Sequence, residues 1–584
     1  EVRTLQILDL ILPEYSIVRA LSAAGGDDEG PGLNINPFKR KNKPPVAFWS
    51  GILPCDAGER SFEYRVPDWF NGSLRIMAVI VSDDSIGTAS RTARVRNDYV
   101  ISPNVPPVVS PGDEFEVGVR VLHDAASAGK SATAVKLELK ASHHFEAIEE
   151  SSFTADLELG QERTFFFRLR AKDLLGAGSL DFIASGGGAS STLSESVSLR
   201  PALPYRVQLD TGRLVNAEKE VALERKMHEE FRKVEASASY LPTGMSLGLK
   251  EYLDSYPYGC TEQIVSRAFP ALALRALPDF GVSEKDTLES FLAAQKVLRA
   301  RQNQDGGFGL WAANDDVSAF VTAYAMHFLT DARDAGLPVE GSLMSEGLRN
   351  LKMIAGEDPA KAASDYRARA YAIYVLTRNG VVTTNYINGL LAGKDLPRDW
   401  KAGFAGTYLA GAYAIMKQSG EARTLLSASF AGKAGEDDFR NGLAATGLCL
   451  YVASRHAPGS AEAMARTALE GIADAISGSE YNTLSSSYAI LGLCAYAKEA
   501  SFAGRDKIGV RVKVADGTYK DLKLEGSAVL RATLPYDATT AKVADETGNP
   551  LYYSVSQAGF DLAPPVAAVK KGIEVYREYQ DSGG

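Results

Sequence analysis

Between residues 61 and 205, apolar and polar residues alternate with a period of two in short stretches. Segments such as SFEYRV, SLRIMAVIVS, EFEVGVRVL, AVKLELKA and TFFFRLRA are separated by turns rich in Gly, Pro, Asn and Asp. This pattern is typical of antiparallel strands that bury one face. It predicts immunoglobulin-like β-sandwiches, divided into a β-domain over residues 46–100 and a β-sandwich over residues 101–204.

From Pro242 to Ala500 the pattern changes to helices rich in Ala and Leu. A related apolar motif recurs there, as in VTAYAMHFLTDA, ARAYAIYVLTRNG and LGLCAYAKEA. Its tyrosines are spaced by roughly 40–47 residues, a period that fits helical hairpins stacked against one another. They are Tyr324, Tyr371, Tyr413, Tyr451 and Tyr496. For residues 242–500 we predict an all-α domain that closes into an α/α toroid.

Strand-like alternation flanks these helices on both sides. It occupies residues 205–241 and returns after Ala500 in KIGVRVKVADG, AVLRATLP and LYYSVSQAG. Strands that are distant in sequence can pair in one sheet, so an insertion into a single β-domain would give this order. We expect residues 205–241 and 501–566 to be the halves of one split β-domain. Residues 567–584 would then begin a further domain.

The N-terminal 45 residues contain the one conspicuous linker. Ser22–Pro45 is rich in Gly and Pro, has few regularly spaced apolar residues and ends in a basic cluster. Such a composition favours an exposed, mobile segment. Two interpretations remain open, a plain connector and a segment that a protease cleaves near Phe38, Lys39, Arg40 and Lys41. Because the chain starts at Glu1 without a signal-peptide pattern, we expect a piece of a longer protein.

Composition narrows the classes of function. The 584 residues carry 63 Lys+Arg against 73 Asp+Glu, and a net charge of −10 opposes broad nucleic-acid binding. The sequence contains no run of about 18 uncharged apolar residues, so no transmembrane segment is predicted. Cys55, Cys260, Cys449 and Cys494 show no spacing typical of zinc sites, so we expect neither a metal nor another cofactor. Cys449 and Cys494 lie in apolar helical patterns and are expected to be buried and inert.

The stretch SYPYGCTEQ carries the candidate chemistry. Cys260 and Gln263 are three residues apart, so on the first turn of a helix their side chains share one face, while Thr261 and Glu262 point elsewhere. A thiol beside a carboxamide can release ammonia and form an internal thioester. An amine or hydroxyl that attacks this bond takes the Gln263 carbonyl and releases the Cys260 thiol. A buried Cys next to a surface Gln is the alternative for so short a motif.

The run Gly259-Cys260-Thr261-Glu262-Gln263 resembles the GCxEQ thioester signature of the α2-macroglobulin and complement family. The longer string YPYGCTEQIVSRAFPAL is similar to the bacterial α2-macroglobulins in particular. The resemblance implies macroglobulin-type β-domains, a toroidal thioester domain at residues 242–500 and an interrupted CUB-type domain at residues 205–241 and 501–566. KKGIEVYREYQDSGG, residues 570–584, resembles the start of a final macroglobulin domain, at residues 567–584, that is cut off.

The resemblance also implies a function. In the family, a protease cuts a bait segment, the protein rearranges, and the thioester couples to lysine amines of the protease. It implies a broad-range endopeptidase inhibitor that is not an enzyme, with residues 1–45 as bait or linker. It further implies a monomer in the periplasm or cell envelope of a Gram-negative bacterium, with a lipid anchor on the full-length protein as one option.

Nucleophile choice depends on histidine in this family. Members that favour hydroxyl targets use a His from the toroid, and residues 345–376, where it would align, contain none. His327 lies in the apolar run AYAMHFL and is expected to be a hydrogen-bonded core residue. Direct attack by amines is therefore predicted. The rings of Tyr256 and Tyr258 could exclude water from the bond, or could simply pack.

Two other classes of function remain open. The thioester could serve a surface-attachment or adhesion module that couples to amines on other surfaces. The segment RQNQDGGFGLW, Arg301–Trp311, resembles the turns of terpene cyclases, which also have α/α toroids. A cyclase-type enzyme is therefore a third, weaker hypothesis, because a shared fold does not establish a shared function.

Overall fold

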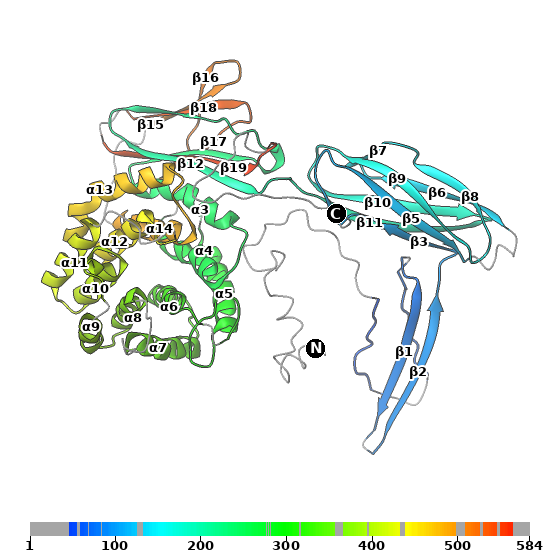
Figure 1. Cartoon of the computed structure of the whole chain (residues 1–584), viewed down its shortest axis with the longest axis horizontal. Helices are drawn as coiled ribbons and strands as arrows, with labels where there is room; N and C mark the ends of the chain where they lie inside the picture. Colours follow the sequence, from blue (N-terminus) through cyan, green and yellow to red (C-terminus); the bar gives the residue numbers. More distant parts are fainter. Residues whose placement is uncertain are drawn as a thin grey trace, which may run out of the picture. The chain divides into compact units, whose positions relative to one another are not determined.

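The computed structural model describes residues 46–563, apart from residues 55–58, 68, 83, 125–131, 276, 278–279, 281, 315–316, 357–365, 394–395, 432–438, 498–507, 526–528 and 546–548. The proposed cleavage residues Phe38–Lys41, Cys55 and residues 567–584 lie outside the described part. The chain divides into two compact units at Pro204 and Tyr205 (Figure 1). The described α-helices all belong to the second unit.

The first unit contains a β-hairpin. Strands β1 (Gly72–Val81) and β2 (Ile86–Val95) pair antiparallel and, among the described residues, form a sheet of two strands. Several of its apolar side chains are exposed, namely Ile76, Met77, Val79, Ile80, Val81 and Ile86. The prediction of a strand at residues 61–66 (SFEYRV) is wrong, since these residues are not in a strand. Alternation alone does not make a strand, because the backbone also needs a partner for its hydrogen bonds.

A β-sandwich follows the hairpin in the first unit. One sheet has the strand order β4-β11-β10-β6-β8 and the other β3-β5-β9-β7. The strands are β3 (Tyr99–Asn104), β4 (Val108–Val109), β5 (Glu114–His123), β6 (Thr133–Ala141), β7 (Phe145–Ala147), β8 (Ser152–Leu157), β9 (Glu162–Ala171), β10 (Gly176–Gly186) and β11 (Ala189–Leu199). The expected alternation is clear in β5, where Val117, Val119 and Val121 are buried between exposed or half-buried neighbours. Strand β3 starts at Tyr99, within the range expected for the preceding domain.

The second unit contains two further sheets, built from strands on both sides of the helices. Their orders are β12-β19-β14-β17 and β13-β18-β15-β16. The strands are β12 (Tyr205–Leu214), β13 (Glu218–Ala222), β14 (Lys233–Ser239), β15 (Ile508–Val514), β16 (Tyr519–Asp521), β17 (Leu530–Thr533), β18 (Ala538–Asp545) and β19 (Leu551–Phe560). Since β12 pairs with β19 and β13 with β18, the helical region is inserted between strands of shared sheets.

The helices between β14 and β15 form a closed ring with a second, outer layer. They are α3 (Ser246–Ser255), α4 (Thr261–Leu274), α5 (Glu284–Arg301), α6 (Ala319–Asp334), α7 (Gly341–Gly356), α8 (Tyr366–Arg378), α9 (Thr384–Leu391), α10 (Phe404–Ile415), α11 (Ser419–Ala431), α12 (Gly442–His456), α13 (Pro458–Ser477) and α14 (Thr483–Ala497). Each of α4, α6, α8, α10, α12 and α14 packs against the next, and α14 packs against α4. Helices α5, α7, α9, α11 and α13 each pack outside an inner helix (Figure 1).

Sequence composition explains the two layers. The inner helices are buried over most of their surface, and in α6 every residue from Val321 to Ala332 is buried. The outer helices bury one face, as α5 does with Thr287, Phe291, Ala294 and Leu298. The repeating tyrosines identified from the sequence fall one on each inner helix from α6 to α14.

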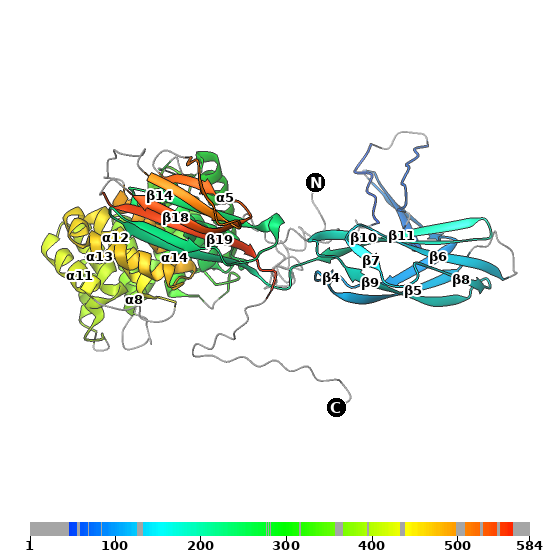
Figure 2. The same ribbon diagram turned by 90° about the horizontal axis from the view of Figure 1, so that it is seen from above.

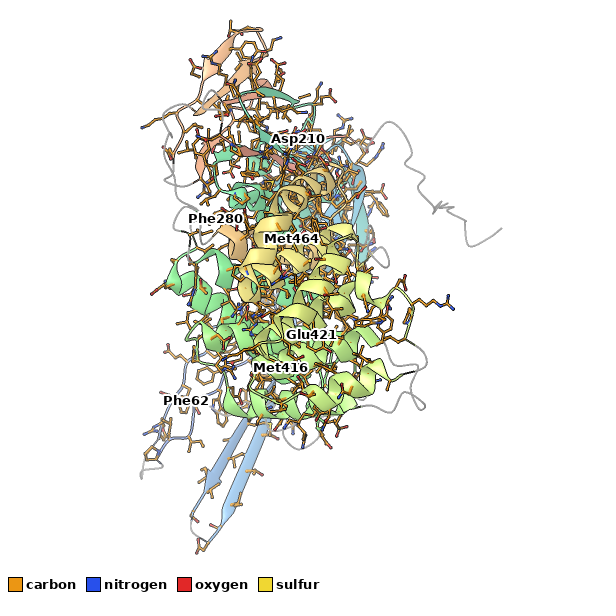
Figure 3. All side chains as sticks on the ribbon, turned by 90° about the vertical axis from the view of Figure 1, so that its left-hand side faces the viewer. Phe62, Asp210, Phe280, Met416, Glu421 and Met464 are labelled. Carbon is orange, nitrogen blue, oxygen red and sulfur yellow. The ribbon has the colours of Figure 1, made fainter. Side chains whose placement is uncertain are left out.

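One sheet of the second unit packs against the helical ring (Figure 2). The backbone N–H of Thr211 in β12 donates to Ser477 Oγ at the end of α13 over 2.9 Å. Leu209 of β12 shares an apolar cluster with Ile472 and Ile476 of α13. In the side view, Asp210 of β12 lies above the helices, whereas Met416 at the end of α10 lies toward the opposite end of the ring (Figure 3).

Candidate functional site

The candidate site lies at the start of the inner helix α4. Helix α3 ends at Ser255, and Cys260 is the N-cap of α4 with an extended backbone, φ −65° and ψ 165°. Gln263 is the third helical residue, and its side-chain Oε1 accepts a 2.9 Å hydrogen bond from the backbone N–H of Cys260. The cysteine and glutamine side chains that the motif singled out therefore share one helical turn. Cys260 is buried and Gln263 is half-buried.

Thr261, between the two, joins the Cys260 turn to a glycine-rich loop. Its hydroxyl donates to the carbonyl of Gly309 over 2.6 Å, and its backbone N–H donates to the carbonyl of Leu310 over 2.9 Å. The loop folds tightly because of its glycines. Gly306 has φ +83°, and a Cβ at Gly309 would lie 2.0 Å from the carbonyl oxygen of Ala312. The turn whose sequence resembled that of cyclases thus supports the Cys260 turn.

Arg301, the last residue of α5, strengthens this connection. Its Nη1 donates to the Gly259 carbonyl over 2.9 Å, to Thr261 Oγ1 over 3.2 Å and to the Leu310 carbonyl over 3.1 Å. The guanidinium thereby holds both residues that flank Cys260. Gly259 itself has no positive φ, and a Cβ there would meet only Ile264 Cδ1 at 3.6 Å.

Glu262 points into the ring, away from the thiol. Its carboxylate accepts from Ser266 Oγ over 2.6 Å and from Thr483 Oγ1 over 2.9 Å. Thr483 is the first residue of α14, so this contact joins the two helices that close the ring. Burial raises the pKa of Glu262, and the hydroxyl donors only partly oppose that shift.

The Tyr-Pro-Tyr loop covers the site incompletely. Tyr256 is half-buried and its ring packs edge-on against Tyr252 and Tyr258, with centroids 5.7 Å apart in each pair. Burial is the main cause that raises the pKa of Tyr256, and the nearby Glu262 and Cys260 add to it. The ring of Tyr258 is 58% exposed. Of these two rings, Tyr256 is therefore the one placed to limit access of water.

A second arginine fixes the backbone of that loop. Arg267, on the second turn of α4, donates from Nη2 to the carbonyl of Tyr256 over 2.8 Å and from Nε to Leu253 over 3.3 Å. Three residues of the site, Arg267, Arg301 and Thr483, were not predicted from the sequence as site residues. Arg267 could have been predicted to lie near the site, because it lies four residues after Gln263 and so one turn further along the same helical face.

The electrostatic surroundings of the Cys260 thiol are mixed. Burial raises the pKa of the thiol, and the carboxylate of Glu262 acts in the same direction. The backbone amides of Gln263 and Glu262 and the charge of Arg301 oppose the rise. Helix N-termini favour negative charge, so the N-cap position of Cys260 also favours the thiolate form of its sulfur.

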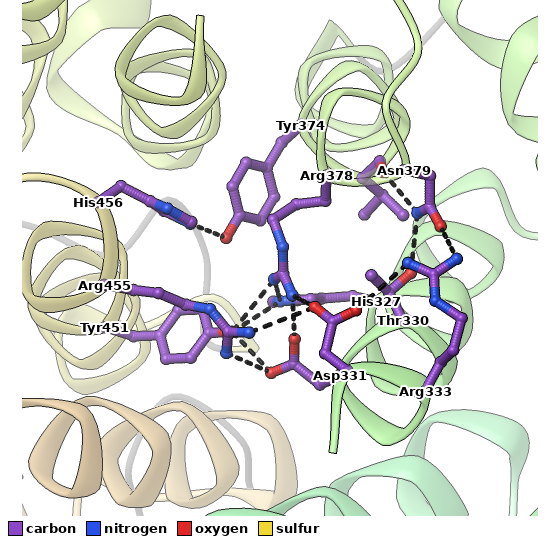
Figure 4. Close-up of polar contacts among 12 residues, drawn as sticks. His327, Thr330, Asp331, Arg333, Tyr374, Arg378, Asn379, Tyr451, Arg455 and His456 are labelled. Atoms are coloured by element: carbon purple, nitrogen blue, oxygen red, sulfur yellow. Dashed lines mark hydrogen bonds and ion pairs between the residues drawn. The ribbon is translucent and has the colours of Figure 1, made fainter. Parts of the chain in front are cut away.

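His327, on the inner helix α6, belongs to a separate polar cluster in the ring (Figure 4). Its Nδ1 lies 2.9 Å from the Tyr371 hydroxyl and its Nε2 lies 3.1 Å from the Tyr451 hydroxyl. Burial lowers the pKa of His327 to about 3. The prediction of a buried, hydrogen-bonded core histidine is confirmed, and both ring nitrogens are occupied by tyrosine hydroxyls.

Asp331 is the centre of this cluster. Its carboxylate accepts from Arg378 Nη2 over 2.6 Å, from Tyr451 over 2.7 Å and from Arg455 Nη1 over 3.0 Å. Burial alone would raise the pKa of Asp331, but His327, the two arginines and Tyr451 lower it to about 2. Nearby, His456 Nε2 lies 2.9 Å from the Tyr374 hydroxyl.

Two other cysteines of the described part of the chain lie in the helical ring. Cys449 and Cys494 are buried as expected, and burial raises the pKa of Cys449 to about 12. Within the described ranges, no group of three or more His, Cys, Asp or Glu residues could hold a metal ion. No helix in the described part of the chain is long and apolar enough to cross a membrane.

Comparison with known proteins gives consistent matches. A sequence model of the Alpha-2-macroglobulin family matches residues 46–137. An alpha-2-macroglobulin homolog of Yersinia pestis is 34% identical over 100% of this chain and 30% of its own length. The alpha-2-macroglobulin of Rickettsia conorii is 33% identical over 100% of this chain and 31% of its own length. The chain thus spans about a third of the length of the curated relatives it matches.

Solved structures support the fold. The native conformation of Escherichia coli alpha-2-macroglobulin matches with a TM-score of 0.64 at 20% identity, over 85% of this chain and 32% of that one. These structures share β-rich domains and a helical region with this chain.

Proposed function

The chain belongs to the alpha-2-macroglobulin family, and from that premise we propose that Cys260 and Gln263 form an internal thioester. In its formation, the Cys260 sulfur attacks the side-chain carbonyl of Gln263, a C–S bond replaces the C–N bond, and ammonia leaves. An amine that later attacks the same carbon forms an amide, and the Cys260 thiol is released. The acyl group is stored in advance and used once.

One observation carries this proposal above the others. Gln263 Oε1 is held 2.9 Å from the backbone nitrogen of Cys260, at the N-terminal turn of α4. This bond keeps the carboxamide folded back toward residue 260, and the thiol belongs to the same residue. Thr261 and Arg301 fix the backbone on either side of Cys260. A buried Cys beside an unconstrained surface Gln would not need these contacts.

The domain assignment follows from the same family membership. A ring of six inner helices surrounded by outer helices supports an α/α toroid as the thioester domain at residues 242–500. The pairing of β12 with β19 and of β13 with β18 supports one split CUB-like domain at residues 205–241 and 501–566. The sandwich of β3–β11 suits a macroglobulin domain at residues 101–204, and the segment 46–100 would belong to a neighbouring one.

For the whole protein we propose a broad-range endopeptidase inhibitor rather than an enzyme. Cleavage of a bait in residues 1–45, near Phe38–Lys41, would expose the thioester to lysine amines of the attacking protease. A periplasmic or envelope location in a Gram-negative bacterium, a monomeric state and a lipid anchor on the full-length protein belong to the same proposal. Glycerol-like hydroxyls should react much more slowly than methylamine, because a hydroxyl needs a general base and both ring nitrogens of His327 are engaged.

The decisive experiment is mass spectrometry of the peptide that contains Cys260 and Gln263. An intact thioester lowers the peptide mass by one ammonia and protects Cys260 from alkylation. Unchanged mass together with immediate alkylation in fresh protein refutes the proposal. If the bond is present but methylamine treatment leaves protease retention unchanged, the surface-attachment role is favoured over trapping.

A further inference from the structure

Arg301 is the one cation whose hydrogen bonds bracket the candidate nucleophile among the described residues around Cys260. Its Nη1 contacts the carbonyl of the residue before Cys260 and the hydroxyl of the residue after it, at 2.9 Å and 3.2 Å. A third bond, of 3.1 Å, reaches the Leu310 carbonyl in the glycine-rich loop. The half-buried guanidinium is therefore held through Nη1 by three acceptors, two of them on the residues that flank Cys260.

We propose that Arg301 is a positioning residue that controls the acyl transfer from Gln263, by holding the Cys260 backbone and by stabilising the thiolate that leaves. This inference rests on the proposed thioester. When an amine attacks, the C–N bond forms and the C–S bond breaks, and the electron pair stays on sulfur. The proton of the attacking amine passes to water or to the thiolate.

The physical reason is that negative charge develops on sulfur only as the bond breaks. A positive charge fixed on the two residues that flank Cys260 stabilises the transition state more than the neutral thioester. Arg301 already acts on the free thiol in this sense, since it lowers the pKa that burial raises. The opposing charge is Glu262, whose carboxylate faces Ser266 and Thr483 instead of the sulfur. Tyr256 is a further titratable group near the thiol.

The test compares Arg301→Gln with Arg301→Lys. Gln removes the charge and keeps a donor, whereas Lys keeps the charge and loses the forked geometry. Arg299→Gln is the matched control, because Arg299 lies on the same last turn of α5 but bonds Gln302 and Glu346. Two quantities are measured on the folded chain: the rate of labelled methylamine incorporation, and the pH dependence of iodoacetamide alkylation of Cys260 after methylamine has reacted.

We expect Arg301→Gln to slow incorporation about three- to tenfold and to raise the pKa of the released thiol by about half a unit to one unit, since a half-buried charge is partly screened. In Arg301→Lys the pKa of the released thiol should stay close to the wild-type value. Arg299→Gln should match the wild type in both the incorporation rate and the thiol pKa. Equal rates and equal thiol pKa values in Arg301→Gln and wild type overturn the proposal. If Arg301→Gln slows methylamine incorporation but leaves the thiol pKa unchanged, the result overturns the proposed stabilisation of the thiolate.

Two further outcomes, a variant that does not fold and a wild type without a thioester, can be distinguished from a failure of the Arg301 proposal. If Arg301→Gln does not fold, a thiol pKa in Arg301→Lys that is a full unit above the wild type overturns the proposal, and one close to the wild type supports it. If the wild type shows no thioester by mass, the proposed function fails, yet the alkylation profiles still test whether Arg301 stabilises the Cys260 thiolate.

Discussion

The helical ring contains two polar sites with opposite characters. In the Cys260–Gln263 turn, the hydrogen bonds described above go to the backbone and to flanking residues, and the Cys260 thiol is the group proposed to react. In the His327–Asp331 cluster, both histidine nitrogens and both carboxylate oxygens have side-chain partners. Fully satisfied buried polar networks stabilise and specify a core. Burial of an ionisable group in the ring interior is therefore not enough to identify it as a functional group.

The largest effect should come from Cys260→Ala. It removes the sulfur and so abolishes the proposed thioester entirely, while costing about 1 kcal/mol or less of stability, because Cys260 is an N-cap that belongs to none of the buried apolar clusters. Heating the wild type should let the Gln263 backbone nitrogen attack its own activated carbonyl, and water then cleaves the chain between Glu262 and Gln263. Fragments 1–262 and 263–584 on a denaturing gel measure this.

Cys449→Ala is the matched control for that experiment. It removes another buried thiol of the same ring, one whose surroundings offer no glutamine partner in the same turn. Heat fragmentation should persist in Cys449→Ala and vanish in Cys260→Ala. Fragmentation that survives in Cys260→Ala would show that the cleavage has another origin.

The second effect is on stability and concerns the other site. Asp331→Asn leaves the guanidiniums of Arg378 and Arg455 without their buried counter-charge, and should cost about 3–5 kcal/mol in the free energy of unfolding. Urea denaturation measures it. Asp334→Asn is the control, because Asp334 also pairs with Arg378 but is 38% exposed, and should cost about 1 kcal/mol or less. A comparable loss in both variants would contradict the central role of Asp331.

The cluster should also make the protein sensitive to acid. The folded pKa values of His327 and Asp331 are lowered, to about 3 and about 2, so their stabilising contribution is present at neutral pH. It is lost as the pH falls, from about 6.5 for His327 and about 4 for Asp331, down to the folded values. Unfolding midpoints in urea measured across this range should fall less steeply in His327→Gln than in the wild type.

A smaller effect of opposite sign is expected at Glu262. Its folded pKa is raised above the ordinary 4.5, so its contribution is complete below that pH and is lost as the pH rises. Glu262→Gln keeps an oxygen for Ser266 and Thr483 and should cost less than about 1 kcal/mol in acid. At higher pH the variant should equal or exceed the wild type in urea denaturation. A stability difference that is independent of pH would show that burial of charge is not the controlling factor.

These contrasts show what could be predicted from the sequence. The period-two pattern correctly predicted β5, and the tyrosine repeat marked the inner helices, because both signals are local and reflect burial. The three-residue spacing of Cys260 and Gln263 is a local signal of the same kind, because both residues lie in one helical turn. The contact of Glu262 with Thr483 spans 221 positions, and no local pattern indicates it. The strand predicted at residues 61–66 is absent from the structure, because a local alternation of apolar and polar residues does not supply a partner strand.

The smallest effect should distinguish the two tyrosines of the loop that covers the site. Tyr256→Ala removes the half-buried ring nearer the thiol and should hasten spontaneous loss of the thioester about two- to fivefold, because water gains access to the acyl carbon. Tyr258→Ala removes a ring that is 58% exposed and should change the rate little. Tyr256→Phe keeps the ring and tests whether the hydroxyl matters. Free Cys260 thiol, titrated over time, gives the rates. Equal rates in Tyr256→Ala and Tyr258→Ala would mean that the loop does not shield the bond, and that protection depends on the backbone clamp of Thr261 and Arg301 alone.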